Sequence, residues 1–274
     1  MASRRMLLTL HLAHALEHDE LRVVYQPIIN ARTGKITCAE ALLRWWHRDL
    51  GAISPGEFIP VAEESGQIIP ITDWVLEQVV AQVREWDEQG LSLERVFVNI
   101  SGILFLRGNL VEQLTRLLEP WPNLRGRIGL EITEQAAVQD IKAAIKTIND
   151  LAAFSVQAAI DDFGSGYSSL SYVQQLPVSK LKIDRAFVTD VPDNHRNVAL
   201  VRGVVGMAHG LGLTVVAEGV ETVPQQRFLE SVGCDLLQGY LFGRPMSAHD
   251  FAQRLMAQDQ PAPRPPHSPL DAII

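Results

Sequence analysis

Cysteine is scarce in this sequence, and long apolar runs are missing from it. The two cysteines, Cys38 and Cys234, lie far apart in no zinc-type spacing, which argues against a disulfide scaffold and favours free thiols in a reducing cytoplasm. No apolar run reaches the roughly 18 residues that a membrane helix needs, so we expect no membrane contact by this segment. Positive charge is also in deficit, because 24 Lys and Arg face 32 Asp and Glu. The resulting net charge of −8 argues against DNA as a partner.

The remaining composition is that of a globular protein. Hydrophobic residues make up 47% and charged residues 20% of the 274 positions. Leucines recur at helical spacing from Leu8 to Leu16, so residues 1–20 are predicted to form an amphipathic lead-in helix rather than a signal peptide. The proline-rich residues 259–274 are predicted to be a disordered tail. The domain proper is therefore expected within residues 21–258.

Within that range, short apolar runs typical of strands alternate with longer helical stretches. Eight such runs in a chain of this length predict an α/β fold, a modified (β/α)8 TIM barrel. The first two runs are separated only by NARTGK, which is too short for a parallel crossover, so one barrel strand is predicted to be antiparallel. The predicted strands are 21–29, 36–45, 95–101, 128–134, 156–163, 180–188, 214–221 and 236–243.

Polar residues fall towards the carboxyl ends of these strands. In a (β/α)8 barrel those ends meet at one mouth, and the mouth holds the active site. A single acid there could be a core residue paired with an arginine, but a ring of carboxylates would raise the pKa of each member unless cations neutralise it. We therefore expect divalent metal ions. The polar residues are Glu40, Asn99, Ser101, Glu131, Glu134, Asp161, Asp162, Lys182, Asp184, Glu218, Glu221 and Gln238.

The donor chemistry narrows the choice of metal and reaction. All the candidate ligands offer oxygen, apart from Lys182, which favours Mg²⁺ or Mn²⁺ over Zn²⁺. The adjacent Asp161 and Asp162 can serve two ions if one carboxylate bridges them. Lys182 is placed to orient an attacking water or to stabilise charge on a phosphate. The pattern predicts metal-dependent hydrolysis of a phosphodiester.

The run AEALLRW at 39–45 resembles the signature of the EAL-domain family of cyclic di-GMP phosphodiesterases. The resemblance covers nearly the whole chain, and its motifs occur in order. It implies a barrel with one antiparallel strand and hydrolysis of cyclic di-GMP to linear pGpG with two Mg²⁺ or Mn²⁺ ions. The other matching motifs are YQP at 25–27, SPGEFIPVAEESG at 54–66, NIS at 99–101, EITE at 131–134, DDFGSGYSSL at 161–170, LPVSKLKIDRAFV at 176–188, VVAEGVET at 215–222 and QGYLFGRP at 238–245.

The resemblance also implies two sets of metal ligands, which share one aspartate. None of these ligands departs from the family pattern. Hydrolytically inactive relatives usually lose one or more of the acids, so the intact sets favour an active enzyme. The first set is Glu40, Asn99, Glu131 and Asp161, and the second set is Asp161, Asp162 and Glu218.

Other residues are matched to roles around the metals. Lys182 matches the lysine that contacts the nucleophilic water, and Glu221 matches a neighbouring acid that orients this water. Glu134 matches the acid that steadies the loop DFGSGYSS, which follows the fifth predicted strand. The substrate-contacting positions are Gln26, Arg44 and Gln238, and the guanidinium of Arg44 suits a phosphate oxygen.

One alternative function and several partners stay open. A catalytically weak receptor module that binds cyclic di-GMP would need Arg44 and Gln238 but not the metals. The family further implies a homodimer, and the full-length protein is expected to include a sensory or GGDEF domain upstream, which could anchor it to a membrane. Binding in EDTA without product, even after metal is restored, would favour the receptor.

Overall fold

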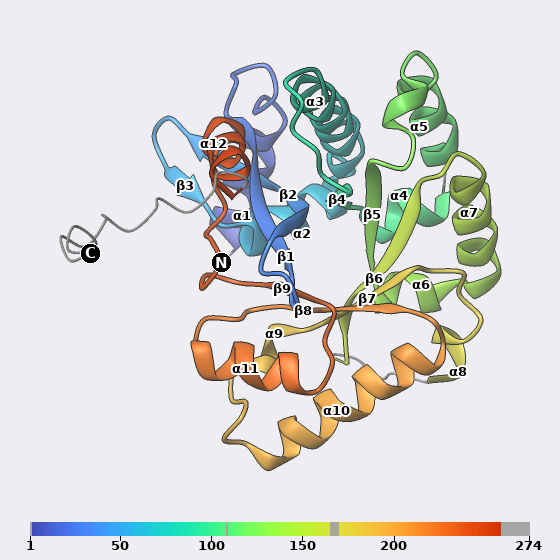
Figure 1. The fold of residues 1–274 in the computed structure, drawn as a ribbon. Coiled ribbons are helices and arrows are strands. Elements are labelled where there is room, and N and C mark those ends of the chain that lie inside the picture. Colours follow the sequence, from blue (N-terminus) through green and yellow to red (C-terminus); the bar gives the residue numbers. More distant parts are fainter. Residues whose placement is uncertain (1, 108, 165–169, 259–274) are drawn as a thin grey trace, which may run out of the picture.

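The computed structural model describes residues 2–107, 109–164 and 170–258, and the predicted barrel is present in this part of the chain (Figure 1). A 9-stranded sheet runs in the order β1-β9-β8-β7-β6-β5-β4-β2-β3, and a further pairing of β1 with β2 closes eight of the strands into a barrel. The strands are β1 (Leu21–Asn30), β2 (Ile36–His47), β3 (Gly51–Ile53), β4 (Arg95–Asn99), β5 (Ile128–Thr133), β6 (Gln157–Phe163), β7 (Lys180–Ile183), β8 (Thr214–Ala217) and β9 (Leu236–Gln238).

The prediction of one reversed strand is confirmed. Strand β1 pairs antiparallel with both of its neighbours, β2 and β9, whereas all other neighbouring barrel strands pair in parallel. Strand β3 lies outside the barrel because it only extends the end of β2 as a hairpin. The parallel strands therefore present their carboxyl ends at a common mouth, as the sequence predicts.

Helices surround the barrel, with α3, α5, α7 and α10 on its outside (Figure 1). No helix among the described residues is both long and apolar enough to serve as a membrane span. The helices are α1 (Ala2–Leu12), α2 (Pro55–Ser65), α3 (Ile68–Glu88), α4 (Gly102–Arg107), α5 (Leu110–Leu118), the 3-10 helix η1 (Pro122–Leu124), α6 (Glu134–Gln139), α7 (Ile141–Ala153), α8 (Leu170–Val173), α9 (Arg185–Val188), α10 (His195–Gly210), α11 (Val223–Ser231) and α12 (Ala248–Gln258).

The lead-in helix is shorter than the predicted residues 1–20. Helix α1 ends at Leu12, and the chain then turns so that strand β1 can begin at Leu21. Glu20 fixes this turn, because its buried carboxylate accepts a hydrogen bond from Trp45 Nε1 at 3.0 Å and its carbonyl accepts one from the N–H of Trp46. The predicted tail, residues 259–274, lies outside the described residues.

Several strands end earlier in the structure than the sequence predicts. The predicted strand 180–188 ends at Ile183 and gives way to helix α9, whose N-terminus is capped by the side chain of Asp184. The predicted strands 95–101, 214–221 and 236–243 likewise end at residues 99, 217 and 238. Ser101 and Glu221, which lie beyond these points, are in loops at the mouth, where Ser101 lines one cavity and Glu221 lines another.

The barrel interior is divided into two layers by the alternation of side chains along each strand. The lower layer is a buried apolar cluster consisting of Ile28, Cys38, Phe97, Ala159, Val216 and Leu236. Two residues further along their strands, towards the mouth, come Glu40, Asn99, Asp161, Glu218 and Gln238. Together with Glu131 and Lys182, these five residues form what we call the mouth layer.

Candidate active site

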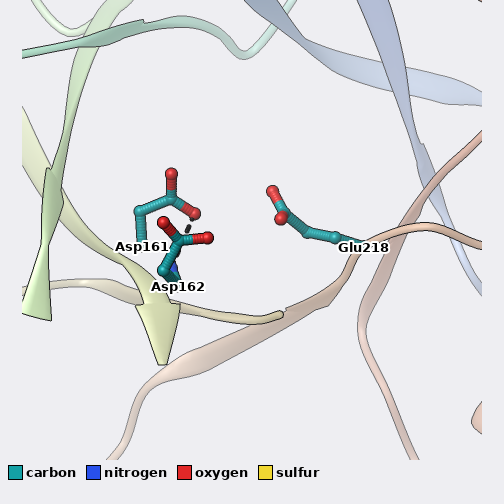
Figure 2. A group of neighbouring side chains, drawn as sticks. All are labelled: Asp161, Asp162 and Glu218. Atoms are coloured by element: carbon teal, nitrogen blue, oxygen red, sulfur yellow. Dashed lines mark hydrogen bonds between the residues drawn. The ribbon is translucent and has the colours of Figure 1, made fainter. Parts of the chain in front are cut away.

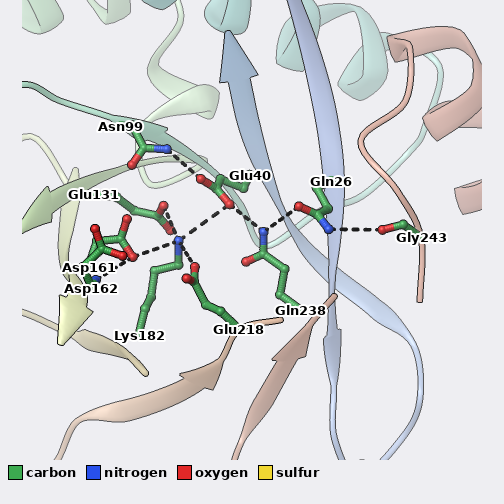
Figure 3. Close-up of polar contacts among 10 residues, drawn as sticks. All are labelled: Gln26, Glu40, Asn99, Glu131, Asp161, Asp162, Lys182, Glu218, Gln238 and Gly243. Atoms are coloured by element: carbon green, nitrogen blue, oxygen red, sulfur yellow. Dashed lines mark hydrogen bonds and ion pairs between the residues drawn. The ribbon is translucent and has the colours of Figure 1, made fainter. Parts of the chain in front are cut away.

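The structure brings the predicted mouth residues together (Figure 3). Glu40 and Glu131 lie within β2 and β5, Asn99 and Gln238 are the last residues of β4 and β9, and Glu218 follows β8 directly. Gln26 on the reversed strand β1 pairs in register with Glu40. Residues from eight strands or strand ends therefore converge on one site, as the barrel topology requires.

Lys182 occupies the centre of this site. Its side chain is only 1% exposed, and its Nζ lies 2.6 Å from Glu131 Oε2, 2.6 Å from Glu218 Oε1, 3.3 Å from Asp161 Oδ1 and 3.6 Å from Glu40 Oε2 (Figure 3). Burial disfavours the ammonium, but the surrounding carboxylates, led by Asp161, outweigh this effect and raise the pKa of Lys182 well above its ordinary value. Lys182 is therefore a fixed cation and cannot act as a general base near neutral pH.

One ammonium does not neutralise so many carboxylates. Burial raises the pKa of Glu131 well above its ordinary value, and the charges of Glu40, Asp161 and Glu218 add to this effect against the opposing charge of Lys182. Burial likewise raises the pKa of Glu218 to about 8. These acids hold their protons more tightly than free carboxyls because the site lacks positive charge.

Glu40 is the exception among the buried acids. Burial pushes its pKa upwards, but the Lys182 charge and two amide hydrogen bonds outweigh burial and hold the pKa below its ordinary value. Asn99 Nδ2 donates to Glu40 Oε1 at 2.6 Å, and Gln238 Nε2 donates to Glu40 Oε2 at 2.5 Å. Gln238 Nε2 also donates to Gln26 Oε1 at 3.2 Å, so the Glu40 carboxylate is held by an amide chain that ends at Gly243 O (Figure 3).

Strand β6 bends where it delivers its two aspartates. The pairing of β6 with β7 shifts register between Ile160 and Phe163, and Asp162 has a left-handed φ of 54°. Neighbouring residues of a regular strand point to opposite faces, so this irregularity lets both carboxylates reach the mouth. Burial and the charge of Asp161 raise the pKa of Asp162 to about 6.

Asp161, Asp162 and Glu218 together meet the requirements of a metal site. Each offers a carboxylate oxygen, and these oxygens lie within 4.8 Å of one another (Figure 2). In the described part of the chain, no other group of three His, Cys, Asp or Glu residues satisfies this condition. An all-oxygen donor set beside a site short of positive charge fits a hard divalent cation such as Mg²⁺ or Mn²⁺.

Two cavities open from this cluster, and Asp161 lines both. The first, of about 290 Å³, extends between the end of β2 and helices α2 and α3, and Arg44 lies on its wall. The second, of about 200 Å³, is lined by Gln26, Glu40, Glu218, Glu221 and Gln238. The predicted substrate-contacting residues are thus split, with Arg44 on one side of the acids and the two glutamines on the other.

Glu221 and Glu134 lie at the periphery of the site. Glu221 is exposed on the wall of the second cavity, outside the group of ligating oxygens around Asp161. Glu134 is buried as the first residue of α6, and its Oε2 accepts a hydrogen bond from the N–H of Gly164 at 3.2 Å. Gly164 is the third residue of the predicted loop DFGSGYSS, whose residues 165–169 lie outside the described residues.

Some cavity residues were not selected from the sequence. Arg185, Gly219 and Tyr240 line the second cavity, and each lies within three residues after a mouth residue, so their positions just after the strand ends could have revealed them. Glu63 lines the first cavity from helix α2. No strand-end signal marks Glu63, because only the packing of α2 against the barrel brings it to the site.

Comparisons with known proteins agree with this architecture. The chain is 41% identical over 250 residues to the bifunctional diguanylate cyclase/cyclic di-GMP phosphodiesterase MucR of Pseudomonas aeruginosa, covering 91% of this chain and 36% of that protein. It is 38% identical over 245 residues to the cyclic di-GMP phosphodiesterase NbdA of the same species, covering 89% of this chain and 31% of that protein. The chain thus spans about a third of the length of these relatives.

Solved structures match over a similar range. The PaMucR phosphodiesterase in complex with c-di-GMP superposes with a TM-score of 0.85 at 41% identity, covering 89% of this chain and 99% of that chain. The EAL enzyme Bd1971, with cAMP and cyclic di-GMP bound, gives a TM-score of 0.87 at 33% identity over 93% of this chain and 69% of that chain. The family model of the EAL domain matches residues 10–245, and the chain belongs to the EAL-domain family.

Proposed function

We propose that this chain is a metal-dependent phosphodiesterase that hydrolyses cyclic di-GMP to linear pGpG in bacterial second-messenger signalling. The observation that carries the proposal is the mouth layer, in which buried carboxylates surround a single lysine and two of them, Glu131 and Glu218, have raised pKa values. Similarity to two relatives named as cyclic di-GMP phosphodiesterases supports this substrate.

Two metal ions would share the acids of the mouth. Glu40, Asn99, Glu131 and Asp161 would hold the first, and Asp161, Asp162 and Glu218 would hold the second. When bound, the ions supply Lewis-acid polarisation of the phosphoryl group and lower the pKa of water. The raised pKa values of Glu131, Glu218 and Asp162 mean that metal binding must displace protons from these carboxyls.

The remaining residues would orient the reactants. Lys182 Nζ, a permanent donor, would hold the attacking water or stabilise charge on the phosphate, and Glu221 would orient the water from the rim. Gln26, Arg44 and Gln238 would contact the dinucleotide from the two cavities, and Glu134 would steady the loop that follows β6. Hydrolysis breaks one P–O3′ bond, so the product carries a 5′-phosphate and a free 3′-hydroxyl.

The direct test is to incubate the protein with cyclic di-GMP and Mg²⁺ or Mn²⁺ and to separate the nucleotides by chromatography. We expect pGpG, and we expect Glu40→Ala to reduce turnover by more than about 100-fold, because a ligand that two amides hold in place is lost. Glu17→Ala, at an exposed site on the lead-in turn, serves as the control. Tight binding without pGpG, with metal restored and in each assembly state, would support the receptor alternative instead.

We also propose an arrangement for the rest of the protein. Residues 21–258 would form the catalytic domain, preceded by the lead-in segment 1–20, and two copies would associate as a homodimer whose assembly affects turnover. A sensory or GGDEF domain would precede this segment in the full-length protein, with this part in the cytoplasm. Light scattering during turnover tests the dimer: full activity of a species that is monomeric at assay concentration would contradict it.

A further inference from the structure

The end of the barrel opposite the mouth carries a second group of polar side chains. Arg95, Gln157 and Lys180 are the first residues of β4, β6 and β7. Side chains two residues apart on a strand share a face. Arg95 therefore points into the barrel below Phe97, which belongs to the lower layer, and Gln157 lies below Ala159 in the same way. This group sits at the amino ends of the parallel strands, away from the acids of the mouth layer.

Lys180 is a buried cation without an anionic partner. It is 7% exposed, and its ammonium forms no hydrogen bond or ion pair with any described residue. The ring of Phe97 lies 5.9 Å from Nζ, near the outer limit of about 6 Å for a cation–π contact. Lys182, on the same strand, is also buried but is surrounded by four carboxylates. A lysine is almost never buried unless it is paired, so Lys180 needs a counter-charge that the described residues do not supply.

Arg95 is a second cation beside the same ring. Its stem uses the space that Gly129 leaves open, where an added Cβ would lie 2.5 Å from Arg95 Cδ and 2.5 Å from Phe97 Cε1. Arg95 Nη1 donates to Gln157 Oε1 at 2.5 Å, and the same oxygen accepts from Ser179 Oγ at 3.0 Å. Arg95 Nε is buried and has no hydrogen-bond partner among the described residues. The guanidinium thus keeps an unsatisfied donor and has a neutral amide, not a carboxylate, as its partner.

No acid of the described chain neutralises these two cations. Glu94 is exposed and forms no ion pair with either of them. Burial lowers the pKa of Arg95, and the charge of Glu94 does not offset this effect. Both cations also act on one buried thiol, since burial raises the pKa of Cys38 and the charges of Lys180 and Arg95 oppose the rise. Two positive charges therefore lie close together below the lower layer.

The donors at this end of the barrel fit a phosphate group. The ammonium of Lys180 is a compact charge with three donors, and the planar guanidinium of Arg95 matches the oxygens of a tetrahedral oxyanion. A phosphate group carries a charge of about −1.5 to −2 near neutral pH, which balances two cations. A carboxylate would balance only one of them. Charge and donor geometry together favour the phosphate.

We propose that Lys180 and Arg95 form a binding site for a phosphate group at the amino ends of the barrel strands, opposite the mouth. Neither residue lines the two cavities of the candidate active site, and the inference does not depend on the proposed function. The bound group satisfies the open donors and so stabilises the closed end of the barrel. Inorganic phosphate and the phosphate of a nucleotide share this chemistry, and the experiment distinguishes them.

The test measures thermal unfolding of the full chain in EDTA, where the metal-free acids of the mouth repel anions. Potassium chloride is replaced stepwise by potassium phosphate or by 5′-GMP at constant pH and ionic strength. We expect a saturable rise in the melting temperature of the wild type by about 2–4 °C, because an anion that binds only the folded state stabilises it. The rise should be lost in Lys180→Met and largely kept in Lys180→Arg. The control is Lys142→Met, at an exposed position of α7, which should respond like the wild type.

Phosphate also stabilises proteins in general because it is excluded from their surface, so the difference between wild type and variant decides the outcome. Lys180→Met should fold, since an apolar side chain of similar length replaces a buried charge. Arg95→Lys, which keeps the charge but loses the planar fork, gives a second comparison and should need more phosphate for the same rise. A response to 5′-GMP alone, lost in Lys180→Met, would identify a nucleotide as the source of the phosphate. An equal rise in wild type and Lys180→Met, or no rise with either ligand, would overturn the inference.

Discussion

The lower layer and the mouth layer of the barrel belong to the same strands but have opposite chemistry. Cys38 precedes Glu40 by two residues, Phe97 precedes Asn99, and Val216 precedes Glu218. The lower positions form an apolar cluster without strong acids, whereas the mouth positions carry buried charge. A shift of two residues along a strand thus separates a packed core from a reactive site.

This difference shows which part of the barrel stabilises the fold and which part strains it. Buried apolar groups lower the free energy of the folded state, whereas buried like charges raise it. Burial first, and the neighbouring carboxylates in addition, raise the pKa values of Glu131 and Glu218, so ionising these two acids is unfavourable in the folded state. Mutations in the lower layer should therefore act on stability, and mutations in the mouth layer should act on activity with little loss of stability.

The largest effect is expected for Phe97→Ala in the lower layer. The Phe97 ring is 1% exposed and fills the space above Gly129, where an added Cβ would lie 2.5 Å from ring atom Cε1. Removing the ring leaves a cavity that should lower the free energy of unfolding by about 3–5 kcal/mol, measured by urea denaturation. Phe154→Ala, at a half-buried helix end, should cost clearly less. A loss below about 1 kcal/mol for Phe97→Ala would contradict the role of the lower layer.

Asp161→Ala should show the opposite behaviour. Asp161 lines both cavities and lies 3.3 Å from Lys182 Nζ, so its removal should reduce pGpG formation by more than about 100-fold, or about 3 kcal/mol in the barrier. The melting temperature of the metal-free protein should stay the same or rise, because one of the repelling charges is gone. Asp193→Ala, at an exposed position, is the control. A large loss of stability in metal-free Asp161→Ala would contradict the proposal that mutations in the mouth layer act mainly on activity.

The pH dependence of stability gives a smaller and more specific test. Burial raises the pKa of Glu218 from 4.5 to about 8, so the folded state keeps a proton that the unfolded chain releases. This contribution to stability is complete below pH 4.5 and is lost as the pH rises through about 8. In EDTA, the unfolding free energy of the wild type relative to Glu218→Gln should fall between pH 5 and 8, by no more than about 1.4 kcal/mol per pH unit. A flat difference would show that Glu218 is ionised throughout.

The two layers also differ in how far the sequence reveals them. The acids of the mouth were predictable because the period of the strands and the barrel topology place them at the carboxyl ends of the parallel strands. The antiparallel orientation of β1 was predictable because the connection NARTGK to β2 is too short for a parallel crossover. The bend at Asp161 and Asp162 was not predictable, since it depends on a left-handed φ at Asp162, a conformation that is uncommon outside glycine and that no local sequence signal marks here. Glu63 was missed because α2 reaches the cavity only through tertiary packing. The strand ends were overestimated because apolar residues such as Val188 and Val220 continue into the loops and into α9.

The smallest effect is expected at Glu134, which lies outside both layers. Its carboxylate accepts a hydrogen bond from the N–H of Gly164 at 3.2 Å, directly after the bend that delivers Asp161 and Asp162. Glu134→Gln keeps the shape but removes the charge, so the bond should weaken by about 0.5–1.5 kcal/mol. Because Glu134 positions the chain after the aspartates and is not itself assigned as a metal ligand, kcat should fall several-fold while the concentration of Mg²⁺ that gives half-maximal rate stays unchanged. Glu134→Ala should lower kcat further. Substitution of a metal ligand would instead raise the concentration of Mg²⁺ that gives half-maximal rate. If the Mg²⁺ dependence of the rate shifts in Glu134→Gln, Glu134 itself binds metal and belongs with the mouth acids. The distinction between residues that bind the metals and residues that hold the metal ligands in place would then fail.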